Sequence, residues 1–145
     1  MRSPTIRIAT ADDGERITLL AAQLGYSSGP EQTRERIAAL SPLSHHVVYV
    51  AELDDGIIGW LHAHVHHTIT DDASTEIAGL VVDAQFRGTG VGRALMAAAE
   101  EWARSQGCKS VRLRSNVVRS GAHAFYRRLG YEITKSQHAF RKQLC

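Results

Sequence analysis

Residues 75–106 constrain the fold of this chain more than any other stretch, because they read as a strand, a glycine-rich turn and a long helix. Residues 76–82 end in a run of β-branched and apolar side chains, which is typical of a strand. After a short interruption, residues 87–93 follow with the sequence RGTGVGR. Three glycines in five residues let the backbone turn with its amide groups pointing inward, because no Cβ atom blocks the required dihedral angles. Amides at the start of a helix bind anions, so we expect a ligand that carries phosphate.

Three interpretations of the glycine turn compete. A dinucleotide fingerprint requires G-x-G-x-x-G and an acidic residue about 20 positions later, whereas this turn reads G-x-G-x-G and the next strand carries Arg112 and Arg114. A P-loop requires G-x-x-x-x-G-K-[ST], a string that the sequence lacks. A tight turn that binds no ligand is the third interpretation. Arg87 argues against it, because its guanidinium stands beside the amides, where it can meet phosphate.

The rest of the pattern predicts an α/β fold in a single domain of residues 1–145, with a sheet of mixed polarity. The expected strands are residues 5–10, 46–53, 57–66, 76–82, 109–115, 131–134 and 137–144. Helical spacing of apolar residues predicts two helices between the first two strands, one after Gly92 and one that ends near Gly130. The strands at 76–82 and 109–115 are joined by a helical crossover, which implies that they run parallel.

Composition narrows the class of protein. Of the 145 residues, 43% are hydrophobic and 22% charged, which is typical of a soluble globular protein, and the formal net charge of +2 does not argue for nucleic acid. No apolar run approaches the roughly 20 residues of a transmembrane helix, and no signal peptide is visible, so no membrane partner is expected. The two cysteines show no metal or redox spacing, so we expect free thiols in the reducing cytoplasm.

Two motifs, residues 87–92 (RGTGVG) and residues 122–131 (AHAFYRRLGY), resemble those of the GNAT superfamily of acetyl-CoA-dependent N-acetyltransferases. Residues 87–92 match its pyrophosphate motif, [QR]-x-x-G-x-[GA], and the preceding Leu80-Val81-Val82 looks like the end of its fourth strand. Residues 122–131, AHAFYRRLGY, resemble its A-x-x-F-Y-x-x-x-G-[FY] signature. The order of elements is similar over nearly the whole chain. The resemblance implies the GNAT fold, a mixed and mostly antiparallel sheet of about seven strands with a splayed central parallel pair and helices on both faces.

The resemblance also implies acetyl-CoA as cosubstrate and a set of residues that would bind it. The pantetheine arm would pair with the backbone of Leu80 and Val82, and Gly79 is compatible with the bulge that the family often has there. Asn116 would bond the pantetheine, although Arg119 departs from the second asparagine of many relatives. The pyrophosphate would be held beside Arg87 by the backbone amides of Gly88, Thr89, Gly90, Val91, Gly92 and Arg93.

Tyr126 matches the general acid of the family, because a phenol near the sulfur can protonate the departing thiolate. A core tyrosine packed with its apolar neighbours would show the same spacing. Many relatives place a carboxylate base in the middle of the fourth strand, where this chain has Ala78 and Gly79. Glu76 is the nearest carboxylate, and it is the candidate general base through a water molecule. A solvated glutamate at a strand edge, with a histidine or solvent as the base, is the alternative.

Six histidines crowd the hairpin region, namely His45, His46, His62, His64, His66 and His67. His62, His64 and His66 share one face of a strand, but side chains two residues apart are separated by about 6.6 Å, so all three would strain to reach one ion. We therefore expect no metal. His64 either lines the acceptor pocket or acts as a base; otherwise this polar face is a candidate contact in a homodimer.

The sequence thus predicts an N-acetyltransferase in which a primary amine attacks acetyl-CoA directly in a ternary complex. A non-catalytic acyl-CoA sensor or accessory module with the GNAT fold is the alternative, and a nucleotide-binding module without acyl chemistry is a more distant one. A small-molecule amine, an aminoglycoside-like polyamine and a peptide N-terminus all remain open as acceptors.

Overall fold

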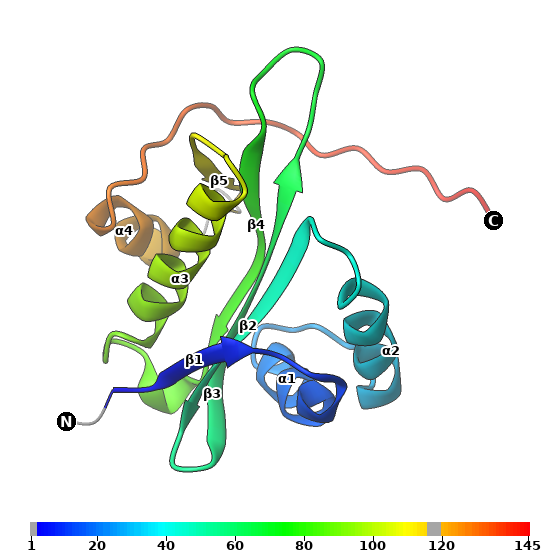
Figure 1. The fold of residues 1–145 in the computed structure, drawn as a ribbon, viewed down its shortest axis with the longest axis vertical. Helices are drawn as coiled ribbons and strands as arrows, with labels where there is room; N and C mark the ends of the chain where they lie inside the picture. Colours follow the sequence, from blue (N-terminus) through cyan, green and yellow to red (C-terminus); the bar gives the residue numbers. More distant parts are fainter. Residues whose placement is uncertain (1–2, 116–119) are drawn as a thin grey trace. The chain divides into compact units, whose positions relative to one another are not determined.

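A computed structural model of the chain describes residues 3–115 and 120–145 (Figure 1). The chain forms two compact units, Met1–Leu113 and Arg114–Cys145, and each is described by itself. The first unit contains the strands β1 (Thr5–Ile8), β2 (His46–Leu53), β3 (Gly56–His66), β4 (Ser74–Val82) and β5 (Val111–Leu113), the helices α1 (Gly14–Ala22), α2 (Pro30–Leu40) and α3 (Val91–Ser105), and the 3-10 turns η1 (Ala11–Asp13) and η2 (Ala84–Phe86). The second unit contains the helix α4 (Ser120–Arg128). The single domain predicted from sequence stays a prediction.

The five strands form one sheet in the order β1-β2-β3-β4-β5. The first three pairings are antiparallel, and β4 pairs with β5 in parallel, which confirms the orientation inferred from the helical crossover. The β2–β3 hairpin turns at Asp54 and Asp55, whose φ angles are 52° and 65°. Aspartate tolerates this left-handed region better than most residues, so the turn forms where the sequence predicts it.

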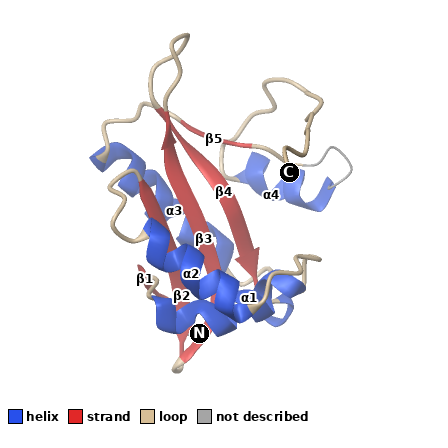
Figure 2. Ribbon diagram, turned by 90° about the vertical axis from the view of Figure 1, so that its right-hand side faces the viewer, coloured by secondary structure: helices blue, strands red, loops and turns tan. Residues whose placement is uncertain are grey.

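Helices cover both faces of the sheet, as predicted (Figures 1 and 2). On one face, Ile17 and Leu20 of α1 and Ile37 of α2 are buried in a hydrophobic cluster with residues of the sheet. On the other face, α3 buries a broad stripe made of Val91, Leu95, Met96, Ala99 and Ala103. The stripe is broad because the helix packs along the sheet and turns more than one line of side chains inward. No helix in the described residues is long and apolar enough to cross a membrane.

The close approach of α3 to the sheet depends on Gly59 in β3. A Cβ atom at this position would lie 3.1 Å from the carbonyl oxygen of Val81, 3.1 Å from Cγ1 of Val91 and 3.2 Å from Cδ1 of Leu95. Both neighbouring side chains are nearly or fully buried, so neither has free space to retreat into. Gly59 therefore sets the distance between α3 and the centre of the sheet.

The expected count of about seven strands is not confirmed, since the described residues form five. The predicted strands at residues 131–134 and 137–144 are not strands in this structure. Several of their apolar side chains are exposed, including Ile133, Phe140 and Leu144. An alternating pattern shows that a segment suits a sheet, but a strand forms only where another strand supplies the partner for its backbone groups.

The substitution Gly59→Ala should lower the free energy of unfolding by about 1–3 kcal/mol, because the added methyl group overpacks the contact between α3 and the sheet. Urea denaturation followed by circular dichroism measures the change. Gly121→Ala is the matched control, because a Cβ atom there meets nothing within 4 Å. Equal stability of the two variants would show that α3 has room to move away from Gly59.

Candidate active site

The strand β4 is interrupted by a bulge in its middle. Gly79 lies opposite His62 and Ile77 lies opposite Ala63, so Ala78 has no partner on β3. Ala78 is also exposed, in contrast to its buried neighbour Ile77. An extra residue on one strand of an antiparallel pair bends that strand and shifts its hydrogen-bonding pattern by one residue. The bulge that the resemblance implied near Gly79 is therefore present.

The bulge decides which backbone groups of β4 point away from β3. In an antiparallel pair these groups alternate, so that every second residue bonds the partner strand. Before the bulge, the amide of Thr75 donates to the carbonyl of Ser110 beyond the opposite edge of β4, at 3.0 Å. After the bulge, the amide of Asp83 donates to the carbonyl of Ile58 at 2.8 Å, toward β3. By alternation, Leu80 and the residue two positions later direct their N–H and C=O groups away from β3.

The pairing of β4 with β5 covers only the first part of β4. It joins Thr75 to Val111, Glu76 to Arg112 and Ile77 to Leu113, and it ends at the bulge. Within residues 3–113, no strand pairs with the outer edge of β4 after that point. The outward backbone groups of Leu80 and Val82 thus lie on an edge that can accept an extended ligand.

The turn after β4 is held in place by residues of α1. The carboxylate of Asp83 accepts a hydrogen bond from the amide of Gln85 at 3.1 Å and forms an ion pair with Arg16 at 2.8 Å. Arg16 also donates to the carbonyl of Ile57 at 2.8 Å. The side chain of Gln23 accepts a hydrogen bond from the amide of Ala84 at 3.0 Å. These contacts were not predicted from the sequence; an aspartate directly after a strand was the available signal, because it commonly caps a turn.

The glycine turn itself has the geometry that the sequence predicts. Gly88 and Gly90 have φ angles of 79° and 95°, in the left-handed region that favours glycine. The first α-helical bond of α3 runs from the amide of Ala94 to the carbonyl of Gly90, at 3.0 Å. The amides of the three preceding residues, Val91, Gly92 and Arg93, therefore have no acceptor within the helix. Residues 87–90 are exposed, so the turn that leads into this helix N-terminus is accessible.

Arg87 lies beside the turn, and its Nε donates to the carbonyl of Val82 at 3.2 Å. This bond shows directly that the carbonyl of Val82 points away from β3. It also places a guanidinium between the outer edge of β4 and the start of α3, where positive charge favours a phosphate group.

Position 79 of β4 has no room for a side chain. A Cβ atom there would lie 2.9 Å from two ring carbons of Trp60, which is closer than side chains tolerate. The indole of Trp60 packs against the hydrophobic cluster on the α1 and α2 face, so it lies over Gly79 on that face. Any larger side chain at position 79 would displace the indole.

Glu76 is buried, with a relative exposure of 7%, so it is not the solvated strand-edge residue of the alternative interpretation. Its Oε2 lies 3.3 Å from Nε2 of His64, and its Oε1 lies 3.6 Å from Nε of Arg112. Both partners come from neighbouring strands of the sheet. A buried carboxylate requires such partners, because burial without them costs about 3–5 kcal/mol.

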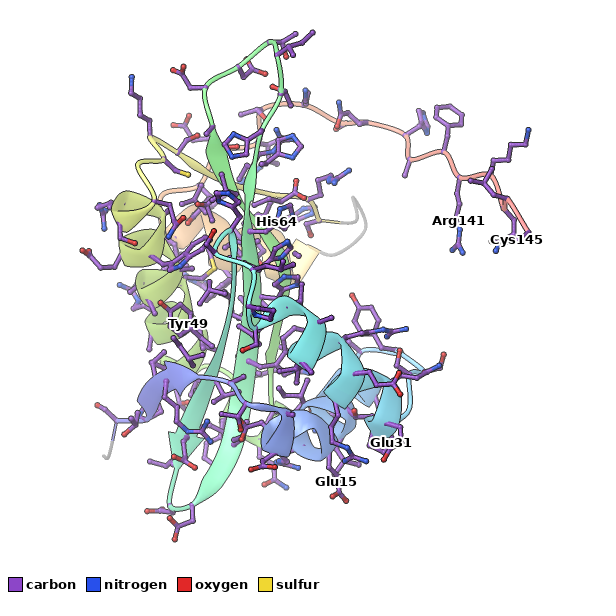
Figure 3. The ribbon with its side chains drawn as sticks, turned by 45° about the vertical axis from the view of Figure 1, so that its right-hand side comes forward. Glu15, Glu31, Tyr49, His64, Arg141 and Cys145 are labelled. Atoms are coloured by element: carbon purple, nitrogen blue, oxygen red, sulfur yellow. The ribbon has the colours of Figure 1, made fainter. Side chains whose placement is uncertain are left out.

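The histidines of β2 and β3 form a cluster next to Glu76. One of them, His64, is labelled in Figure 3. Nδ1 of His46 and Nε2 of His62 are 3.0 Å apart, and the His46 ring stacks on His64 with a centroid distance of 5.3 Å. Burial, followed by the neighbouring imidazoles of His46 and His64, lowers the pKa of His62 to about 4. Burial, followed by His64 and His45, also lowers the pKa of His46. In the described part of the chain, no three His, Cys, Asp or Glu side chains form a metal-binding group.

The second unit carries Tyr126 on α4. Tyr126 is partly exposed, and its ring makes edge contacts with Phe125 and Tyr131 at centroid distances of 5.1 and 6.1 Å. Gly130 has a φ angle of 96°, and the amide of Tyr131 bonds the carbonyl of Tyr126 at 3.0 Å, so the helix ends as predicted. Asn116 and Arg119 lie outside the described residues.

The chain is similar in sequence to known acetyltransferases. The model of the acetyltransferase (GNAT) family matches residues 15–131. An aminoglycoside N(6')-acetyltransferase type 1 of Stenotrophomonas maltophilia is 30% identical, over 98% of this chain and 95% of that protein. An aminoalkylphosphonate N-acetyltransferase of Salmonella typhimurium is 33% identical, over 96% of this chain and 90% of that protein.

Solved structures share the fold. The structure of AAC(6')-Iy in complex with a bisubstrate analog, CoA-S-monomethyl-acetylneamine, superposes with a TM-score of 0.86 at 21% identity, covering 99% of this chain and 100% of that chain. A glucosamine-6-phosphate N-acetyltransferase from Arabidopsis thaliana superposes with a TM-score of 0.82 at 22% identity, covering 98% and 100%. From the family match and the two curated relatives, the chain belongs to the acetyltransferase (GNAT) family and is an acetyl-CoA-dependent N-acetyltransferase.

Proposed function

We propose that this enzyme transfers the acetyl group of acetyl-CoA to the primary amine of a small molecule, by direct attack in a ternary complex. The observation that carries the proposal is the outer edge of β4 after the bulge, which leads straight into the exposed amides of the glycine turn. An extended arm that ends in a pyrophosphate suits this continuous surface. The relatives named for aminoglycosides and aminoalkylphosphonates support a small-molecule acceptor over a peptide.

In this proposal the pantetheine pairs with the outward backbone groups of Leu80 and Val82. The amide of Leu80 donates to the thioester oxygen, where negative charge develops during attack. The pyrophosphate binds the amides of residues 88–93 beside Arg87, and Asn116 bonds the pantetheine amide. The contacts of Leu80, Val82 and the glycine turn use groups that the fold leaves pointing outward or that lie at the helix N-terminus, and Asn116 lies outside the described residues.

The substitution Gly90→Ala should weaken acetyl-CoA binding about tenfold or more, because a side chain strains the left-handed turn by about 1–2 kcal/mol and moves the amides. The dissociation constant from isothermal titration calorimetry measures the effect. Gly107→Ala is the matched control, because Gly107 follows the other end of α3, has a φ of 80° and, like Gly90, has no atom within 4 Å of an added Cβ. Equal loss of affinity in both variants would show that the glycine turn does not bind the cofactor.

In the proposed reaction, two protons move together with the acetyl group. The amine nitrogen bonds the acetyl carbon, the carbon–sulfur bond breaks, and the departing thiolate takes the phenolic proton of Tyr126. The proton that the amine loses passes through a water molecule to Glu76. Glu76 suits this role because it is buried next to the bulge and held by His64 and Arg112.

The substitution Tyr126→Phe should lower kcat by on the order of 10²-fold, with little change in the dissociation constant of acetyl-CoA, because it removes the proton donor and keeps the ring. Steady-state release of free thiol measures kcat. Tyr131→Phe, at the ring that contacts Tyr126, is the control. Unchanged turnover in Tyr126→Phe would show that Tyr126 is not the general acid.

The proposal as a whole is tested by ligand binding and then by turnover. Acetyl-CoA and coenzyme A should raise the unfolding temperature and ATP should not, because the turn lacks the P-loop lysine. Thiol release is then measured with an aminoglycoside, an aminoalkylphosphonate and a peptide with a free N-terminus. Stabilisation by coenzyme A without turnover on any amine would favour the non-catalytic acyl-CoA-binding module. Turnover on the peptide alone would overturn the small-molecule acceptor.

A further inference from the structure

We propose that Arg16 and Gln23 of α1 are positioning residues for the pyrophosphate of acetyl-CoA. By holding the segment that leads into the glycine turn, they set the preference of the enzyme for acetyl-CoA over acetyl thioesters that lack the pyrophosphate. The inference rests on the proposed function, in which the glycine turn binds the pyrophosphate. Both side chains act through η2, which lies between β4 and Arg87, rather than by contact with the cofactor.

The glycine turn depends on its two ends for its position. Among the described residues, no atom lies within 4 Å of a Cβ atom added at Gly88 or Gly90, so the space beside these residues is open. Residues 87–90 are also exposed, and glycine has more backbone freedom than any other residue. The end toward α3 is fixed by Val91, which is 2% exposed. The position of the other end is therefore decided by the contacts that hold η2.

Asp83 joins η2 to α1 through both oxygens of its carboxylate. Oδ1 accepts a hydrogen bond from the amide of Gln85 at 3.1 Å, and Oδ2 accepts one from a terminal nitrogen of Arg16 at 2.8 Å. Nε of Arg16 donates to the carbonyl of Ile57 at 2.8 Å, so the guanidinium is fixed at two points. Asp83 is buried, and a buried carboxylate that is bonded on both oxygens has little freedom to move. The start of η2 is thus tied to α1.

A second contact comes from the C-terminal end of α1. Gln23 follows the last residue of this helix, and its side-chain oxygen accepts a hydrogen bond from the amide of Ala84 at 3.0 Å. Positions 16 and 23 are about two helical turns apart, so both side chains lie on the same side of α1. Arg16 and Gln23 therefore hold consecutive residues, Asp83 and Ala84.

Further hydrogen bonds connect this segment to the glycine turn. The amide of Phe86 donates to the carbonyl of Asp83 at 2.8 Å, which closes η2. The hydroxyl of Thr89 donates to the carbonyl of Phe86, and Nε of Arg87 donates to the carbonyl of Val82. The last two bonds tie residues of the glycine turn to the segment next to α1. A displacement of Asp83 would therefore move the amides that are proposed to bind phosphate.

A loosened turn should weaken binding of the pyrophosphate and not of the pantetheine arm. A loop that becomes ordered only on binding loses conformational freedom at that step, which lowers the affinity. The proposed site of the pantetheine is β4, whose end is fixed to β3 by the bond from the amide of Asp83 to the carbonyl of Ile58 at 2.8 Å. This backbone bond uses neither Arg16 nor Gln23. The two halves of the cofactor therefore report separately on the strand and on the turn.

The anchoring is tested first, on the protein without ligand. Amide hydrogen exchange followed by NMR should be faster at Phe86 in Arg16→Gln and in Gln23→Ala than in the wild type, because both variants loosen η2. The amide of Phe86 bonds neither of the replaced side chains, so it reports on the turn as a whole. Unchanged exchange at Phe86 in both variants would overturn the proposal.

Arg7→Gln is the matched control. Arg7 forms an ion pair with the buried Asp13 at 2.9 Å, and its side chain is 34% exposed, against 42% for Arg16. Its partners are Asp13, Glu52 and the carbonyl of Ile8, away from η2. The control variant should therefore keep the wild-type exchange rate at Phe86.

The affinity for two thioesters tests the consequence. Dissociation constants of acetyl-CoA and of acetyl-pantetheine are measured by NMR titration. Arg16→Gln should weaken acetyl-CoA binding about tenfold, as expected for the loss of a charged hydrogen bond, and should change acetyl-pantetheine binding by less than about twofold. Arg16→Lys keeps a cation for Asp83 and should recover part of the loss. Arg7→Gln should leave both constants unchanged.

Thermal unfolding of each variant identifies a general loss of stability. If Arg16→Gln does not fold, Gln23→Ala decides the question, because this exposed position tolerates the change and its variant should weaken acetyl-CoA binding alone. Equal losses of affinity for both thioesters, or the same loss in Arg7→Gln, would overturn the positioning role, since a merely structural defect affects the whole site. A wild-type preference for acetyl-CoA that the α1 variants retain would overturn only this role. Equal binding of both thioesters by the wild type would instead contradict the proposed pyrophosphate site itself.

Discussion

The one-residue bulge at Ala78 is the constraint on which the rest of the site depends. Before it, β4 bonds toward β5 through residues such as Thr75; after it, the same edge is reached by Leu80 and Val82. A regular strand of the same length would keep one alternation throughout, and the opposite set of backbone groups would face outward. The bulge also marks the point where β5 stops pairing. Within residues 3–113, one inserted residue therefore sets the direction of the hydrogen-bonding groups on the part of β4 that β5 does not reach.

The glycine turn at the start of α3 is held in position from two sides. The α1 helix holds the turn through Arg16 and Gln23, which bond Asp83 and the amide that follows it. The sheet holds the helix through Gly59, where the lack of a side chain lets α3 approach. The glycines of the turn are flexible by nature, so this rigidity comes from their neighbours and not from the turn itself. Amides that are held in place in this way can bind an anion without first rearranging.

The polar cluster beside Glu76 shows how a sheet accommodates buried charge. Strands β2, β3, β4 and β5 each contribute a titratable or charged side chain to the same face, next to the hydrophobic cluster around α1 and α2. Neighbouring strands bring side chains to within hydrogen-bonding distance, whereas residues two apart on one strand are too distant. This is why the histidines, which alternate along one strand in the sequence, contact histidines of the neighbouring strand. It is also why Glu76 has partners that strand periodicity did not identify.

The sequence by itself determined the order of elements through α4, the hairpin at Asp54 and Asp55, the parallel pairing of the last two described strands and the left-handed glycines of the turn. These features follow from local rules, because turn residues, periodicity and crossover connections act over short stretches of chain. The tertiary structure decided which residue bulges, which backbone groups face outward, what holds Asp83 and Glu76, and that residues 131–145 form no strand. Each of these depends on atoms that are distant in the sequence, and a pattern along one strand carries no information about its neighbour.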